Sequence, residues 1–156
     1  MGVNKAEAEE KFEQFLILMD DQIDWLKDEA ESHGIALDMT IADCDRLEQL
    51  FAALSEGKNR DYLAGLAVTF ARYLGEIVRT QYGGNWHLPL DDQKNVNFNT
   101  PVIEGHTKIV GLEFAPISIM QAFALRRKAG LLKRAIDAQI SPIALDLSSL
   151  AAREKN

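Results

Sequence analysis

Apolar side chains recur at steps of three and four residues through the first part of the chain, which is the spacing of one helix face. Between Asn4 and Glu31 the members of this stripe are Phe12, Phe15, Leu16, Met19, Ile23, Leu26 and Ala30. The pattern predicts one long helix. It should end at Ser32-His33-Gly34, because Gly34 can adopt the left-handed conformation that follows many helices.

A second helix is predicted from Ile41 to Ser55, on an apolar stripe that includes Leu47 and Phe51. Thr40 is expected to cap it. Asp43 stands three residues later, where a capping-box acid belongs.

A third helix is predicted from Arg60 to Gln81, and from Tyr62 to Leu74 it is apolar on nearly every side. Such a helix usually lies at the centre of its fold. Gly65 and Gly75 each cost roughly 1 kcal/mol relative to alanine in a helix. We therefore expect both glycines to admit closely packed neighbours.

The periodicity then changes to alternation, which predicts short strands. Trp86 to Leu90 reads as an edge strand, because Pro89 cannot donate a hydrogen bond. A second strand is expected at Val96 to Phe98 and can extend through Val102-Ile103; a third is expected at Thr107 to Val110 and can extend to Phe114. Their short connections favour an antiparallel meander over about residues 85–114.

Pro116 is suited to the first position of a last helix, whose apolar face includes Met120 and Phe123. Gly130 is expected to kink this helix, and residues 151–156 are expected to form a loose tail. The sequence therefore predicts an α+β fold in one domain, residues 1–156, with a core over about 4–140. Three N-terminal helices precede the meander, and a C-terminal helix follows it.

The net charge of −7 is unevenly distributed. Residues 1–56 carry 15 acidic and 4 basic side chains, whereas residues 57–156 carry 9 acidic and 13 basic ones. The acidic half argues against general nucleic-acid binding, which requires a basic face. It is compatible with a basic protein partner, and equally with acids that only solvate helix faces. The candidate partner-binding residues are Glu10, Glu13, Asp20, Asp21, Asp24 and Asp28.

Basic side chains gather in the last helix, namely Arg126, Arg127, Lys128, Lys133 and Arg134. They are suited to binding a phosphate or an acidic partner. Alternatively they complement the acidic first helix, in the same molecule or in a second copy. We favour the second interpretation, which includes a homodimer.

Cys44 is the only cysteine, so no internal disulfide can form, and a reducing compartment is expected. Its neighbours Asp43 and Asp45 should raise the pKa of the thiol and make it a structural residue. Neither a signal peptide nor an apolar run of about 18 residues is visible. These features predict a cytoplasmic protein that does not enter a membrane.

His33, His87 and His106 are the only histidines, and none stands at metal-ligand spacing from another histidine, a cysteine or a carboxylate. The chain also has no nucleophile elbow and no strand-linked phosphate loop. We therefore expect no metal and no cofactor.

The strongest local pattern surrounds Glu76, near the end of the apolar third helix. Arg72 and Arg79 stand one turn away on either side and can pair with it. The indole N–H of Trp86 needs a partner if buried, and Glu76 is a candidate. In the structural interpretation Glu76 joins the helix to the first strand. In the functional one Glu76, Trp86 and His87 line a pocket as acid, platform and donor.

The stretch YLGEIVRTQYGGNWHL, followed by FAPISIMQAFALR, resembles a group of small uncharacterised bacterial proteins. The resemblance covers roughly residues 60–135. It consists of a helix ending in Leu-Gly-Glu, a Gly-Gly-x-Trp turn, short strands and a helix begun by proline. Similar domains include contact-dependent toxin immunity proteins. The resemblance implies a bacterial, cytosolic, non-enzymatic domain and brings no catalytic residues.

Two functions are therefore weighed. The first is a protein-binding domain that uses the acidic N-terminal helical face. The second is a small-molecule-binding or enzymatic domain with its site near Glu76, Trp86 and His87.

Overall fold

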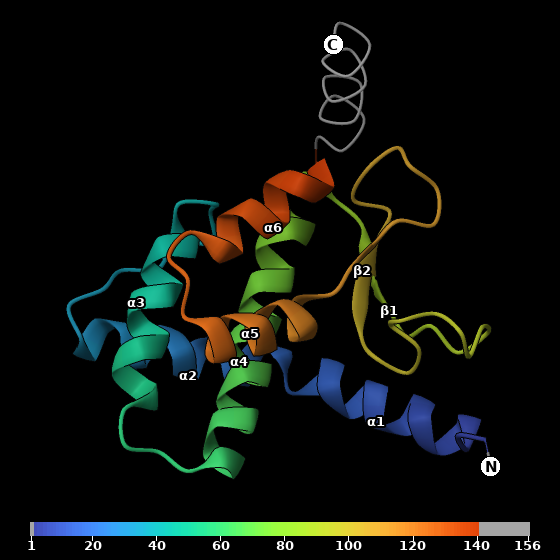
Figure 1. The fold of residues 1–156 in the computed structure, drawn as a ribbon, viewed down its shortest axis with the longest axis horizontal. Coiled ribbons are helices and arrows are strands. Elements are labelled where there is room, and N and C mark those ends of the chain that lie inside the picture. Colours follow the sequence, from blue (N-terminus) through green and yellow to red (C-terminus); the bar gives the residue numbers. More distant parts are fainter. Residues whose placement is uncertain (1, 141–156) are drawn as a thin grey trace, which may run out of the picture.

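The helix α4 (Arg60–Tyr82) runs through the centre of the structure, a computed structural model that describes residues 2–140. The Asn59 side chain caps it by accepting a hydrogen bond of 2.9 Å from the amide of Tyr62. Eleven α4 residues are buried, and the helix contacts elements on every side, among them α2, α3, α5 and β2 (Figure 1). The predicted central position is confirmed. The tail expected at 151–156 lies outside the described residues.

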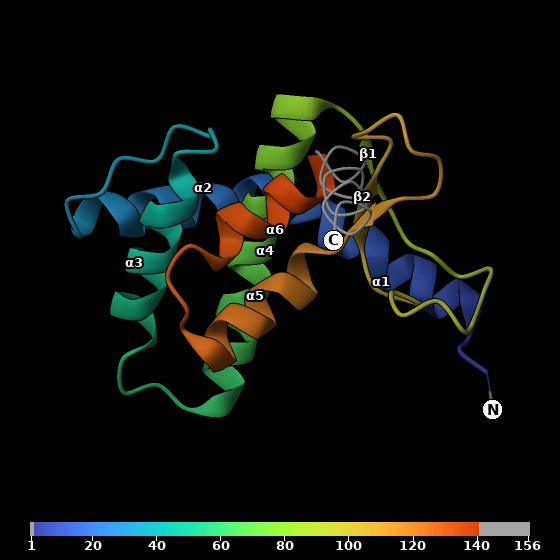
Figure 2. The ribbon, with the colours of Figure 1, turned by 45° about the horizontal axis from the view of Figure 1, so that its top comes forward.

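The predicted first helix is two helices, α1 (Lys5–Ile17) and α2 (Met19–Ser32), interrupted at Leu18. The ribbon bends between them (Figures 1 and 2). At the break, Arg72 Nε of α4 donates to the carbonyl oxygen of Phe15 at 3.2 Å. The Phe15 ring packs edge-on against Trp86, with 5.0 Å between ring centres. The prediction of a single helix is therefore wrong. Arg72 binds the Phe15 carbonyl oxygen and Trp86 contacts the Phe15 ring at the point where the chain bends.

The helix α3 (Asp43–Ser55) begins two residues later than predicted, and Thr40 does not cap it. The Thr40 hydroxyl donates instead to Asp38 Oδ1 at 2.6 Å. Asp43 reaches back as an acid in a capping box does, but its carboxylate accepts from the amides of Asp38 and Met39.

Three short strands form the predicted antiparallel meander: β1 (Asn85–His87), β2 (Val102–Glu104) and β3 (Glu113–Phe114). Trp86 lies opposite Ile103, which in turn lies opposite Phe114. The strands are shorter than expected, and the strand predicted at Thr107 to Val110 is wrong: this segment forms bends and a turn, and the third strand begins only at Glu113. The segment from Asn95 to Phe98 forms turns, in which the side-chain amides of Asn95 and Asn97 donate from Nδ2 to Glu113 Oε1 at 3.0 Å each.

The last helix is also divided, into α5 (Pro116–Arg126) and α6 (Leu131–Ile140). Arg127 takes a left-handed conformation that ends α5. The carboxylate of Glu48 on α3 then accepts from the amides of Gly130 at 2.9 Å and Leu132 at 3.1 Å, which caps α6. Gly130 therefore lies between two separate helices, and the prediction that it only kinks a single helix is wrong.

The α+β class is confirmed, with four helices before the sheet and two after it within residues 2–140, where three and one were predicted. In Figure 1, α5 and α6 lie in front of α4, α2 lies behind it, and the strands lie beside it; the turned view of Figure 2 agrees.

The two glycines of α4 have different surroundings. A Cβ atom at Gly75 would lie 2.3 Å from Trp86 Cη2 and 3.3 Å from Pro116 Cγ. A Cβ atom at Gly65 would meet no atom within 4 Å. The expected close packing is confirmed at Gly75 and wrong at Gly65.

The two glycines make a matched pair of substitutions on one helix. Gly75→Ala should lower the free energy of unfolding by about 1–3 kcal/mol, because the added methyl group overlaps the Trp86 ring. Gly65→Ala should raise it by about 0.5–1 kcal/mol, because alanine favours the helix. Urea unfolding followed by circular dichroism measures both, and equal effects would contradict the packing described here.

Candidate functional site

The cluster around Glu76 is present and is closely hydrogen-bonded. Arg79 donates from Nε to Oε2 at 2.7 Å and from Nη2 to Oε1 at 2.9 Å, and Trp86 Nε1 donates to Oε2 at 2.9 Å. These contacts confirm the predicted pairing with Arg79 and Trp86. Burial raises the pKa of Glu76, but the hydrogen bonds from Arg79 and Trp86 and the charge of Arg79 outweigh it, so the pKa lies below its ordinary value.

Arg72 and His87 do not join this cluster. The Arg72 side chain turns to Phe15, whose ring lies 4.4 Å below the guanidinium carbon, and burial lowers the pKa of Arg72. His87 follows Trp86 on β1, and successive strand residues face opposite sides. Its Nδ1 lies 3.7 Å from Glu104 Oε1, and both side chains are more than one third exposed. Glu76, Trp86 and His87 therefore do not line one pocket together. The geometry of Glu76 favours the interpretation in which this carboxylate joins α4 to the first strand.

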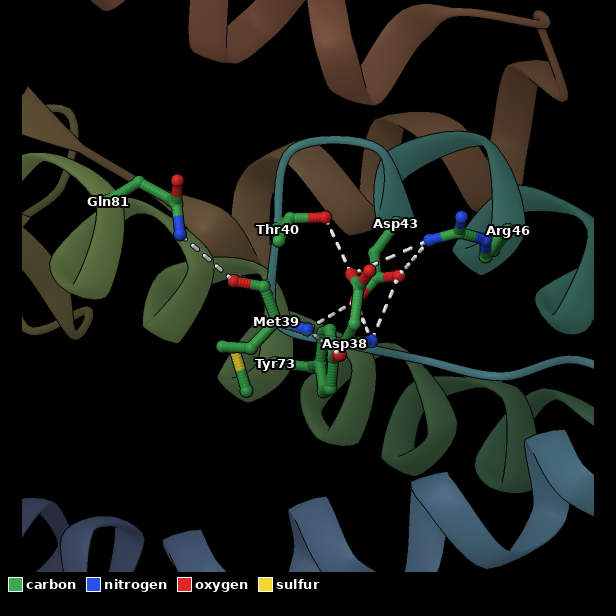
Figure 3. A network of polar contacts seen from close by, with 7 residues as sticks. All are labelled: Asp38, Met39, Thr40, Asp43, Arg46, Tyr73 and Gln81. Atoms are coloured by element: carbon green, nitrogen blue, oxygen red, sulfur yellow. Dashed lines mark hydrogen bonds and ion pairs between the residues drawn. The ribbon is translucent and has the colours of Figure 1, made fainter.

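The carboxylate of Asp43, unlike that of the partly buried Glu76, is fully buried (Figure 3). It accepts hydrogen bonds from the amides of Asp38 and Met39, from the Tyr73 hydroxyl, and from Arg46 Nη1 at 2.6 Å. Burial, followed by the hydrogen bond to Asp43, raises the pKa of Tyr73. With both oxygens in use, Asp43 has no position left for a substrate. It connects the loop before α3 to α4.

Met39 extends this network toward the end of α4 (Figure 3). Its amide also donates to the Tyr73 hydroxyl at 2.9 Å, and its carbonyl accepts from Gln81 Nε2 at 3.3 Å. The left-handed conformation of Met39, with φ at 62°, is held by these bonds. Sequence reasoning did not find the network. The available signal was Tyr73, whose hydroxyl in the most apolar stretch of the chain needed a partner.

Cys44 is the next residue along α3 and is buried. Burial, followed by the charges of Asp45 and Glu48, raises the pKa of its thiol to about 12. The predicted direction is confirmed. At neutral pH the sulfur is therefore a protonated thiol, which is a poor nucleophile.

The six acidic side chains singled out on α1 and α2 are all exposed. Within residues 2–140 none of their carboxylates forms an ion pair or a hydrogen bond. The three apolar residues at the break between the helices, Leu16, Ile17 and Leu18, are exposed as well. We call these nine residues the acidic corner: Glu10, Glu13, Leu16, Ile17, Leu18, Asp20, Asp21, Asp24 and Asp28.

The basic residues of α5 and α6 do not cover the acidic corner. Arg127 lies over the Phe51 ring, 4.9 Å from its centre, and Lys133 pairs with Asp137 of its own helix. No ion pair of the described residues joins α1 or α2 to α5 or α6. The prediction that these basic residues pair with the acidic helices of the same molecule is therefore wrong. Pairing with the acidic helices of a second copy stays a prediction.

Among residues 2–140 no three histidine, cysteine or acidic side chains are grouped closely enough to hold a metal ion. In the same part of the chain, no helix has the length and apolar character needed to cross a membrane.

Comparison of the chain with protein-family models, curated proteins and solved structures found no match.

Tyr73→Phe should lower the free energy of unfolding by about 1–3 kcal/mol, because it removes a partner from the buried Asp43 carboxylate and the Met39 amide. Tyr82→Phe, at an exposed tyrosine of the same helix, is the control and should change it little. Urea unfolding measures both variants. Equal stabilities of the two would show that the hydroxyl contributes nothing to the fold.

Glu76→Gln should lower the free energy of unfolding by about 1.5–3 kcal/mol at neutral pH. The folded-state pKa of Glu76 lies below the ordinary 4.5, so as pH falls the unfolded chain takes up the proton first. The difference between wild type and variant should therefore be constant above that value and shrink as pH falls below it. The control Glu56→Gln, at an exposed carboxylate, should show no such trend. A difference that stays constant down to pH ~3 would contradict the lowered pKa.

Proposed function

We propose that this protein is a non-enzymatic binding protein whose acidic corner binds a basic protein partner. The observation that carries the proposal is the set of six exposed carboxylates, none of which is engaged by another described residue. All six are exposed, whereas residues such as Phe15, Ile23 and Leu26 of the same two helices are buried. An opposite charge on a partner can pair with them without breaking an internal contact.

The corner also offers an apolar centre. Leu16, Ile17 and Leu18 are 37%, 65% and 41% exposed, and Glu13 and Asp20 flank them in sequence. Protein interfaces commonly combine an apolar core with a polar or charged rim. An exposed apolar group of this kind marks an interaction site more often than an isolated surface leucine does.

The charge of this region is suited to long-range attraction. Residues 5–32 contain ten acidic and three basic side chains, which gives a net charge of −7. Such a field raises association rates by roughly 10- to 1,000-fold for a partner of opposite charge. It is screened over ~10 Å at 0.1 M salt, so binding should weaken as salt is added.

The interior supports a non-enzymatic role. Both oxygens of Glu76 and both oxygens of Asp43 accept hydrogen bonds within the chain, and Cys44 is a buried thiol with a raised pKa. The alternative of an enzymatic or small-molecule site at Glu76, Trp86 and His87 has no comparable support, since His87 faces away from Glu76.

We further propose a bacterial, cytoplasmic protein that resembles toxin immunity proteins in its mode of action. A basic toxin is the kind of partner that the charge of the acidic corner favours. The single free cysteine is consistent with a reducing compartment.

The proposal is tested by two variants with the same change in charge. The first replaces four acids of α2 by amides: Asp20→Asn, Asp21→Asn, Asp24→Asn and Asp28→Asn. The control replaces four exposed acids elsewhere: Asp45→Asn, Glu56→Gln, Asp91→Asn and Asp92→Asn. Immobilised wild type should capture a basic protein from the native cells at low salt. The first variant should capture at least about tenfold less, while the control should retain binding.

Equal capture by both variants, or capture by wild type that does not depend on salt, would contradict the proposal. Sedimentation at several protein concentrations separates one further outcome. A dimer that dissociates only in the first variant identifies the partner as a second copy of the chain, bound through its exposed basic residues on α5 and α6.

A further inference from the structure

A cleft of about 370 Å³ lies between α2 and α4, beside the acidic corner. Its walls include Gln22 and Trp25 of α2 and Asp61, Tyr62, Gly65 and Thr69 of α4. None of these residues was proposed above as part of a site. Gln22 and Thr69 fix the distance between the helices, because the Thr69 hydroxyl bonds Gln22 Oε1 at 2.5 Å.

Gly65 is the residue that keeps the cleft open. Gly75 of the same helix is required by the Trp86 ring, whereas a side chain at Gly65 would meet no atom within 4 Å. Its backbone is ordinary α-helix, so no turn geometry requires glycine there either. A glycine that weakens its helix without serving packing or backbone shape is explained by the space that it leaves beside Tyr62 and Trp25.

The walls of the cleft are suited to a cation with a flat face. Trp25 and Tyr62 are 38% and 40% exposed, so their rings are open to a ligand. Aromatic faces attract ammonium and guanidinium groups. The Tyr62 ring already does so within the chain, since Lys58 Nζ lies 5.1 Å from its centre.

The charges around the cleft are mostly negative. Asp61 belongs to the wall and forms no ion pair within residues 2–140. On α2, Asp21 and Asp28 stand one turn to either side of Trp25 and belong to the acidic corner. Lys58 is the opposing cation, and its side chain is exposed, so an arginine that binds here would displace its ammonium from the Tyr62 ring.

We propose that this cleft binds an arginine side chain of the basic partner, and the inference rests on the proposed function for the source of that side chain. The guanidinium would stack on Trp25 or Tyr62 and donate hydrogen bonds to the Asp61 carboxylate. Arginine fits better than lysine, because its planar group both stacks on rings and pairs with a carboxylate through two N–H groups. The acidic corner supplies attraction, and the cleft selects one residue of the partner.

The test uses the full chain labelled with ¹⁵N and titrated with blocked arginine (N-acetylarginine amide). The chain has two tryptophans, so two indole N–H signals are observed. The Trp25 signal should shift with a dissociation constant on the order of 1–10 mM. The Trp86 signal should not move, because its indole is bonded to Glu76. Blocked citrulline, which is neutral and nearly the same shape, should shift neither signal, and blocked lysine should bind several-fold more weakly.

Gly65→Leu fills the cleft from its floor and should abolish the Trp25 shift without lowering the midpoint of urea unfolding. Asp61→Asn should weaken binding at least about fivefold. The control Glu56→Gln should bind as wild type does. An unshifted Trp25 signal with blocked arginine, or full binding by folded Gly65→Leu, would overturn the inference.

The same variants separate this inference from the proposed function. If Gly65→Leu captures the basic partner as strongly as wild type while the four-acid variant of α2 does not, the acidic corner is the binding surface and the arginine cleft is wrong. If blocked arginine binds at the cleft but no basic protein is captured, the cleft recognises a guanidinium and the proposed function is wrong.

Discussion

The contact between Arg72 and Phe15 is the interaction on which the shape of the N-terminal region depends. Arg72 is buried, and no carboxylate of residues 2–140 forms an ion pair with it. A buried charge of this kind is costly unless other groups compensate it. Here the carbonyl oxygen and the ring of Phe15 do so. Because Phe15 is held at this point, α1 ends at Ile17 and the chain bends. The bend places Leu16, Ile17 and Leu18 at an exposed corner between two acidic helices.

Three other polar side chains hold the helices together from within. Asp43 fastens the preceding loop to α4, Glu48 caps α6 from α3, and Glu76 binds the indole of Trp86 on β1. Each carboxylate accepts hydrogen bonds from at least two donors of the chain. A carboxylate satisfied in this way stabilises one arrangement of its neighbours and has little capacity left for chemistry. Free carboxylates lie on the outside, and six of them belong to the acidic corner on α1 and α2. This division between the interior and the surface favours a binding function over a catalytic one.

Periodicity along the chain predicts the elements whose causes are local, including α3, α4 and the helix that begins at Pro116. It does not predict the breaks at Leu18 and Arg127, because the apolar pattern continues across both and their causes are distant in sequence. Arg72 is 57 residues from Phe15, and Glu48 is 84 residues from Leu132. For the same reason the sequence does not predict the contact between Asp43 and Tyr73, whereas Glu76 and Trp86 lie close enough along the chain for their contact to be predicted. The sequence predicts a packing role for Gly65, because a sequence alone does not show whether a glycine faces a neighbour or a cleft.

The central claim is that the outer surface at the bend between α1 and α2 is where this protein meets its partner. Amide hydrogen exchange of the full chain, with and without the basic protein captured at low salt, tests it most directly. The account predicts slower exchange in the peptides that cover residues 10–28 when the partner is bound, with little change in α5, α6 and β1. Protection confined to α5 and α6, or to the residues around Glu76 and Trp86, would contradict it.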